Sequence, residues 1–202
     1  MRFPAISEVR AYWEALRNGR AVPLRAEIDP RGIERALEYA FVLERVAPQV
    51  ARFRLAGLHL TDLMGMEVRG MPATTFFAPA SRQRAAEVIE SVFRGPEIAE
   101  LSLVAETGFG KPPLQAQLLL LPLQSDLGDI SRALGCFVAE GGIGRTPRRF
   151  DVGDISVTRI EAGKQTYRPQ PSSMRGFAEN QQALAGLPKG DRSHLRLVKT
   201  DK

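Results

Sequence analysis

The chain is poor in the residues from which most catalytic and metal sites are built. Its 202 residues include one cysteine and two histidines. The single cysteine, Cys136, excludes an internal disulfide and lies in an apolar stretch, which suits a reducing cytosol. His59 and His194 are far apart, so with Cys136 they supply neither the ligand spacing of a metal site nor a Ser-His-Asp arrangement. We therefore expect a protein that is not an enzyme and holds no metal.

Long apolar runs and a strong charge of one sign are also missing. The apolar run 118–123 is far shorter than the roughly 20 residues that span a bilayer. The first five residues lack the apolar segment of a secretory signal, so we expect a cytoplasmic protein without a membrane partner. A net charge of +5, from 28 basic and 23 acidic residues spread along the chain, does not favour nucleic acid as a partner.

The N-terminal segment has the pattern of an amphipathic helix. Apolar residues recur at three- and four-residue spacing at Ile6, Val9, Trp13 and Leu16. Ser7 could cap this helix, and Asn18-Gly19 could end it. A single apolar stripe must be covered, so the helix either docks on its own domain or forms a dimer contact.

The following segments alternate between helix and strand signals. Asp29-Pro30 predicts a helix start, Ser81 could cap a longer helix that ends at Gly95, and Gly57 precedes one or two helical turns at 58–64. The apolar, β-prone segments that we expect to be strands are 39–46, 50–56, 98–106, 114–124 and 130–139.

The strand at 114–124 is apolar on both of its faces. Leu118 and Leu120 fall on one side, and Leu119, Leu121 and Leu123 fall on the other. An antiparallel strand with one wet face would alternate with polar residues, so both faces need burial. We expect the domain core on one face and the Trp13 helix, a second copy of the chain, or both, on the other.

The composition changes after residue 140. A glycine-rich stretch, 141–144, leads to a basic cluster of Arg145, Arg148 and Arg149 and to a possible short strand at 154–160. From about residue 163 the chain has few large apolar residues, which predicts a flexible tail without a core. These patterns divide the chain into an N-terminal helix and linker at 1–28, a core at 29–140 and a C-terminal extension at 141–202.

The order of elements and several short motifs resemble a known family. The order is similar to that of a PAS domain, and the residues resemble a proteobacterial family of stand-alone PAS-like proteins once catalogued as a domain of unknown function. The motifs are Tyr12-Trp13, Leu16-Arg17, Gly19-Arg20, Pro23, Arg25, Ile28-Asp29-Pro30, Phe53-Arg54-Leu55-Ala56-Gly57, Leu63-Met64-Gly65, Arg69-Gly70, Leu119-Leu120-Leu121-Pro122-Leu123, Asp126 and Leu134-Gly135. The resemblance covers about residues 12–138. It implies an α+β fold, a five-stranded antiparallel sheet with helices over one face, here with the N-terminal amphipathic helix added.

A fold of this kind implies a space between the sheet and its helices. We expect an apolar ligand pocket there, and packed side chains that fill it are the alternative. The expected lining is Phe53, Leu55, Leu63, Phe76, Phe77, Val88, Leu103 and Leu120. The cofactor is left unknown: His59 is conceivable as a haem ligand, but a polar surface or cap role fits a lone histidine better.

The predicted function is that of a non-enzymatic sensor or adaptor in signal transduction. The chain should act through protein–protein interaction, as a homodimer or with a partner such as a sensor kinase. The predicted interaction face comprises Val9, Trp13, Leu16, Leu119 and Leu121.

Two other functions stay open at the level of the sequence. One is a nucleic-acid-associated regulator that uses the basic cluster Arg145, Arg148 and Arg149 with the tail. The other is a small enzyme in a similar fold, with Glu106 or Asp62 as an acid or base inside the cavity.

Arg25 and Arg54 could form ion pairs with Glu27 or Asp62.

Overall fold

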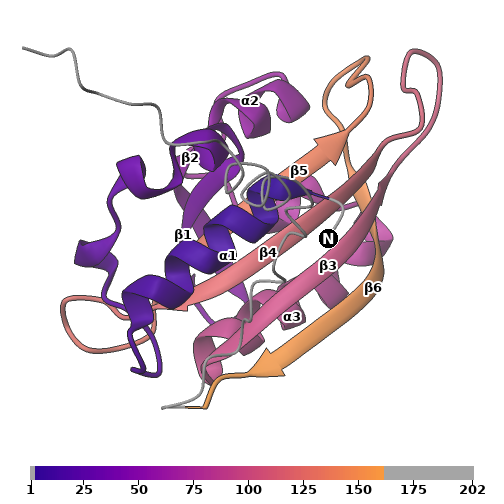
Figure 1. Ribbon diagram of the computed structural model, residues 1–202. Helices are drawn as coiled ribbons and strands as arrows, with labels where there is room; N and C mark the ends of the chain where they lie inside the picture. Colours follow the sequence, from indigo (N-terminus) through magenta and orange to yellow (C-terminus); the bar gives the residue numbers. More distant parts are fainter. Residues whose placement is uncertain (1–2, 162–202) are drawn as a thin grey trace, which may run out of the picture. The chain divides into compact units, whose positions relative to one another are not determined.

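A computed structural model describes residues 3–161, which form one curved antiparallel sheet with helices on both faces (Figure 1). The six strands lie in the order β2-β1-β5-β4-β3-β6, so β5 and β4 are central. The strands are β1 (Ala40–Ala47), β2 (Val50–Ala56), β3 (Glu97–Ala105), β4 (Gln115–Leu123), β5 (Arg132–Glu140) and β6 (Phe150–Arg159). The predicted α+β PAS-like class is confirmed, with six strands in place of the expected five.

Each face of the sheet is covered by its own helices. In Figure 1 α1 crosses one face of β4 and β5, and α3 lies behind the sheet. The helices are α1 (Pro4–Arg17), α2 (Leu58–Met64) and α3 (Arg82–Arg94), and the 3₁₀ segments are η1 (Arg25–Glu27), η2 (Pro30–Tyr39), η3 (Ala73–Phe76) and η4 (Pro79–Ser81). Within the described residues, no helix has the length and apolar character needed to cross a membrane.

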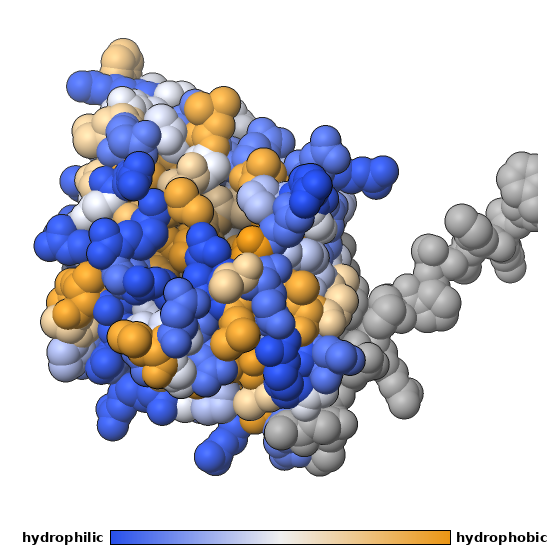
Figure 2. Space-filling model, turned by 90° about the vertical axis from the view of Figure 1, so that its left-hand side faces the viewer, coloured by the Kyte–Doolittle hydropathy of each residue, from blue (hydrophilic) through white to orange (hydrophobic). Residues whose placement is uncertain are grey.

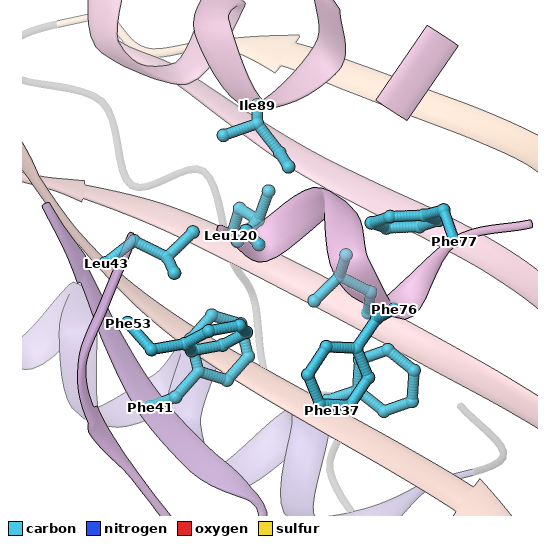
Figure 3. Close-up of a pocket in the computed structure, with 10 residues that line it drawn as sticks. Phe41, Leu43, Phe53, Phe76, Phe77, Ile89, Leu120 and Phe137 are labelled. Atoms are coloured by element: carbon cyan, nitrogen blue, oxygen red, sulfur yellow. The ribbon is translucent and has the colours of Figure 1, made fainter. Parts of the chain in front are cut away.

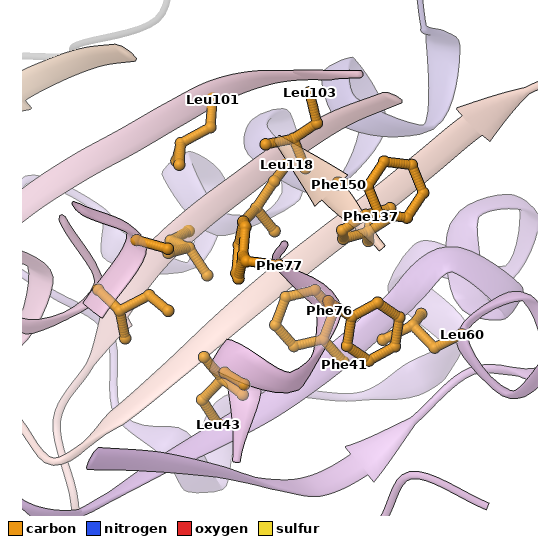
Figure 4. Close-up of a cluster of buried hydrophobic side chains, with 14 of the residues drawn as sticks. Phe41, Leu43, Leu60, Phe76, Phe77, Leu101, Leu103, Leu118, Phe137 and Phe150 are labelled. Atoms are coloured by element: carbon orange, nitrogen blue, oxygen red, sulfur yellow. The ribbon is translucent and has the colours of Figure 1, made fainter. Parts of the chain in front are cut away.

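The inner layer of the core lies between the sheet and α2, η3 and α3. Aromatic and aliphatic side chains from every strand meet there, as Figure 4 shows for Phe76, Phe137 and Phe150. Phe150 is fully buried and comes from β6. The segment after residue 140 therefore contributes to the core, and the short strand expected at 154–160 is a ten-residue strand that pairs with β3 along its length.

The outer layer lies between the other sheet face and α1 with η2. Trp13 is its largest side chain and is fully buried, and its indole N–H donates to the Pro122 carbonyl at 2.9 Å. Leu119, Leu121 and Leu123 of β4 are buried in the same cluster. The prediction that both faces of this strand are kept dry is confirmed, and the N-terminal helix supplies the cover.

Helix starts differ from the expected caps. α1 begins at Pro4 with Phe3 as its N-cap, so Ser7 lies inside the helix. Ser81 precedes α3, but its hydroxyl donates to Asp151 and accepts from the Val152 N–H, because β6 lies beside it. Asp29 does accept from the Arg31 N–H, and the segment that it caps is a 3₁₀ helix. The predicted flexible tail from about residue 163 lies outside the described residues.

Candidate functional site

The expected pocket between sheet and helices is almost completely filled. A cavity of about 10 Å³ remains there, lined only by apolar residues (Figure 3). A space of this size is about that of a single water probe, and without polar partners it stays dry. Small-molecule sites are typically several hundred Å³. The inner core of this structure therefore has no room for a flavin, a haem or a comparable ligand.

A run of phenylalanine rings fills this space. Phe41, Phe53, Phe76, Phe137 and Phe150 contact one another in sequence, with ring centroids 5.0–5.4 Å apart in tilted or edge-to-face arrangements. Such pairs stabilise a core beyond the area that they bury. The rings come from β1, β2, η3, β5 and β6, so they hold the sheet to the short helices.

Most of the predicted pocket residues belong to this inner core. Phe53, Phe76, Phe77 and Leu120 line the residual cavity. Leu63 and Leu103 are buried in the same cluster, and Val88 is partly buried against it.

Leu55 is the exception among the predicted pocket residues. It does not face the inner core, because a β-bulge changes the register of β2. Leu43 pairs with Phe53, but the residue before it, Val42, pairs with Leu55, which leaves Arg54 as the extra residue. A one-residue shift moves the side chains that follow to the opposite face of the sheet. Leu55 is 50% exposed and lines a groove on the outer face.

That outer groove is the larger apolar hollow. It has a volume of about 260 Å³ and lies between η2 and the outer faces of β2, β1 and β5. Figure 2 shows the side of the molecule that holds these elements, where apolar patches lie among hydrophilic side chains. The lining residues are Ile28, Pro30, Ile33, Leu37, Ala40, Phe41, Val42, Leu55, Ala56, Gly57 and Leu134.

A polar pocket adjoins this apolar groove. Val42 lines both, and Arg25, Arg54 and Arg132 line the polar one together with Asp126. Arg54 and Arg132 each form an ion pair with the same carboxylate, that of Glu44. The pairings expected for Arg54 with Asp62 or Glu27 do not form, and Glu27 instead pairs with Arg20 at 2.7 Å.

The predicted interaction face is an interface within the chain. Val9, Trp13, Leu119 and Leu121 are fully buried where α1 packs on β4 and β5, and Leu16 is half-buried. The apolar stripe of the N-terminal helix therefore contacts the sheet of its own chain. A partner could reach these four residues only if α1 moved away.

His59 has a structural environment. Its Nε2 accepts from the Ala139 N–H at 3.1 Å, and its ring packs edge-on against Tyr39 at 4.9 Å. Burial lowers the pKa of this imidazole, and the nearby Glu38 and Asp62 carboxylates oppose the shift. A neutral, hydrogen-bonded histidine that ties α2 to β5 agrees with the polar cap role expected from the sequence.

The other candidate groups are not gathered into a site. Neither Glu106 nor Asp62 lines the inner cavity. Within residues 3–161 no cluster of histidine, cysteine and carboxylate side chains could hold a metal ion. Arg148 is fully buried and donates to the carbonyls of Ile143, Glu106 and Pro112. This arginine of the basic cluster is therefore not available to a nucleic acid.

Comparison with known proteins shows the family of the chain. The model of a family described as "PAS domain" matches residues 1–138. No curated protein matches the chain. Twenty-one solved chains match. One of them, described as "Flavin Analogue Sheds Light on Light-Oxygen-Voltage Domain Mechanism", is 17% identical, with 55% of this chain and 83% of that chain covered and a TM-score of 0.43.

Proposed function

Because the chain belongs to the PAS domain family, we propose that it is a non-enzymatic, cytoplasmic sensor or adaptor that acts in signal transduction by contacting other proteins. The family match over residues 1–138 is the observation that carries this proposal. PAS domains are typically sensory modules. The matched segment holds α1, the first four strands and all but the last two residues of β5, and so it includes the helix that covers the outer face of the sheet.

The packing of the core supports an adaptor that works through its surface. Interlocked phenylalanine rings occupy the place where an internal ligand would sit, and the residual cavity is about 10 Å³. A close-packed interior transmits strain between its two faces better than a loosely filled one. A change at one surface of the sheet can then alter contacts at another without an internal cofactor.

Polar groups with displaced pKa values have structural partners, which supports a non-enzymatic role. Arg45 lowers the pKa of Glu90 in an ion pair at 2.6 Å, and Ser125 lowers that of Asp129 inside the β4–β5 turn. Catalytic acids and bases also show displaced pKa values, and Glu90 lines a surface hollow beside Gln49 and Arg94, but its two oxygens accept from Arg45 and from the Gln49 N–H. The two carboxylates here instead tie a hairpin to α3 and close a turn.

Two classes of partner are proposed. A second copy of the chain would give a homodimer, and a sensor kinase would make the chain an adaptor for an existing signalling pathway. The nucleic-acid-associated alternative is less well supported, because Arg148 is internal.

In-cell crosslinking with a tagged chain at its native level tests the proposal. We expect the wild type to crosslink to a sensor kinase or another signalling protein, or to itself. A matched bait with Phe76→Asp, which places a carboxylate in the filled core, should lose these contacts because the fold is lost. A wild-type bait that crosslinks neither to itself nor to any signalling protein would refute the proposal. Light scattering of the purified chain separates the dimer from the adaptor, since the homodimer has twice the mass of one chain.

A further inference from the structure

We propose that the outer groove and the arginine pocket beside it together form a binding site for a small amphiphilic carboxylate, a molecule with an apolar body and an anionic head. The inference deepens the proposed function, on which its biological meaning rests, because it places a sensory input on the outer face of the sheet. The inner core is filled, and this groove is the larger of the two apolar hollows described above.

The strand register builds the apolar floor of the site. Val42 pairs with Leu55 on β2 and with Leu134 on β5, so these three side chains form one row across the outer face. Ile33 and Leu37 of η2 stand over this row. A ligand that enters between the two layers would be in apolar contact on both sides.

The strand side and the η2 side of the groove each expose apolar surface to water. Leu55 on the floor is 50% exposed, and Leu37 on η2 is 44% exposed. Removing such surface from water is favourable in proportion to its area. Their exposure in one concave groove of about 260 Å³ gives an apolar chain a place to bind.

The neighbouring row of residues on the same sheet face contains the charged side chains of the site. Glu44 is two residues beyond Val42 on β1, and it pairs with Arg132 of β5 in register and by charge. Arg54 forms an ion pair with the same Glu44. Asp126 and Arg25 also line the pocket, with Ala26 and Ser125. Three guanidinium groups therefore face two carboxylates, an excess of one positive charge.

Arg25 is the guanidinium best placed to receive the ligand head. Within residues 3–161 its side chain has no hydrogen-bond acceptor or ion-pair partner, although it is half-buried beside the pocket. A guanidinium matches a carboxylate through two parallel N–H donors. One ligand can place its carboxylate beside Arg25 in the arginine pocket and its apolar chain along the Val42 row in the groove.

Octanoate is the probe for the first experiment, with octylammonium and 1-octanol as probes of the same chain length and different head charge. We expect octanoate to shift the amide signals of Leu37, Leu55 and Gly57 in a saturable NMR titration of the full chain. Octylammonium should bind at least about tenfold more weakly, because the arginine excess repels it. Octanol should lie between the two.

Variants separate this site from nonspecific binding. Leu55→Glu should abolish octanoate binding, since it places a like charge in the groove. The matched control is Val157→Glu, at a position that is 43% exposed on the opposite edge strand, β6, and it should bind as the wild type does. Arg25→Ala should weaken octanoate by about three- to tenfold and leave octanol unchanged, as expected for a partly exposed charge-assisted hydrogen bond. Thermal unfolding confirms that each variant is folded.

Four results would overturn the inference. They are the absence of saturable shifts, shifts confined to inner-core residues such as Phe76 and Leu120, wild-type affinity in Leu55→Glu, and equal affinities for octanoate and octylammonium. The crosslinking experiment uses no amphiphile. If crosslinks persist while octanoate fails to bind, this inference falls and the proposed function stands.

Discussion

Replacing Trp13 should test whether α1 is part of the fold or a detachable contact. Trp13 is fully buried between α1 and the outer sheet face, and its indole donates to the Pro122 carbonyl at 2.9 Å. The β3–β4 register ends at Leu120, two residues before Pro122, and the indole is a side-chain donor to the Pro122 carbonyl at this end of the strand. Removing Trp13 thus leaves a cavity and takes one donor from this carbonyl.

The expected magnitudes follow from these two losses. Trp13→Ala should lower the free energy of unfolding by about 3–5 kcal/mol, the range for large aromatic deletions in a core. Trp13→Phe keeps most of the packing and loses the hydrogen bond, so we expect about 1–2 kcal/mol. Because domains of this kind are stable by about 5–15 kcal/mol, a loss of this size is a large share of the total free energy of unfolding.

Urea unfolding followed by far-UV circular dichroism measures these changes. Tryptophan fluorescence cannot serve, since Trp13 is the only tryptophan in the chain. The control is Leu127→Ala, in the β4–β5 turn, where the leucine is 95% exposed and its loss should cost less than about 0.5 kcal/mol. A loss under about 1 kcal/mol for Trp13→Ala, or a fully folded Trp13→Lys, would refute the assignment of α1 to the core.

Three further predictions concern buried polar groups. Arg45 holds the pKa of Glu90 below its usual value. The stability from this pair is therefore present above about pH 4.5 and is lost as the pH falls through the lowered pKa. Urea unfolding between pH 3 and 6 should show this loss in the wild type and little of it in Glu90→Gln. Arg148→Met should lower stability by about 3 kcal/mol, since three backbone carbonyls lose their donor, and thermal unfolding that matches the wild type would contradict this. Burial raises the pKa of the Cys136 thiol to about 12, so a thiol reagent at pH 8 should label it only after denaturation; labelling of the native chain at the rate of a free thiol would show that the site opens.

Local patterns in the sequence were sufficient to predict the element order and much of the packing. The segments 50–56 and 58–64 are β2 and α2 with the predicted bounds, because alternation defines the first and flanking glycines delimit the second. The double apolar face of 118–123 correctly predicted a central strand, since a strand with two apolar faces is stable only between two covering layers.

Tertiary structure alone decided the points that bear on function. The bulge at Arg54 turns Leu55 outward, and no residue of β2 signals it, because a bulge depends on the register with β1. The sequence predicted only a possible short strand at 154–160, and pairing with the free edge of β3 makes it a ten-residue sixth strand, Phe150–Arg159. Whether phenylalanines line a pocket or fill it depends on volumes contributed by five distant segments. Contacts between residues far apart in the chain determine strand register, cavity volume and ion pairing. The pattern along one segment indicates only which of its sides is buried.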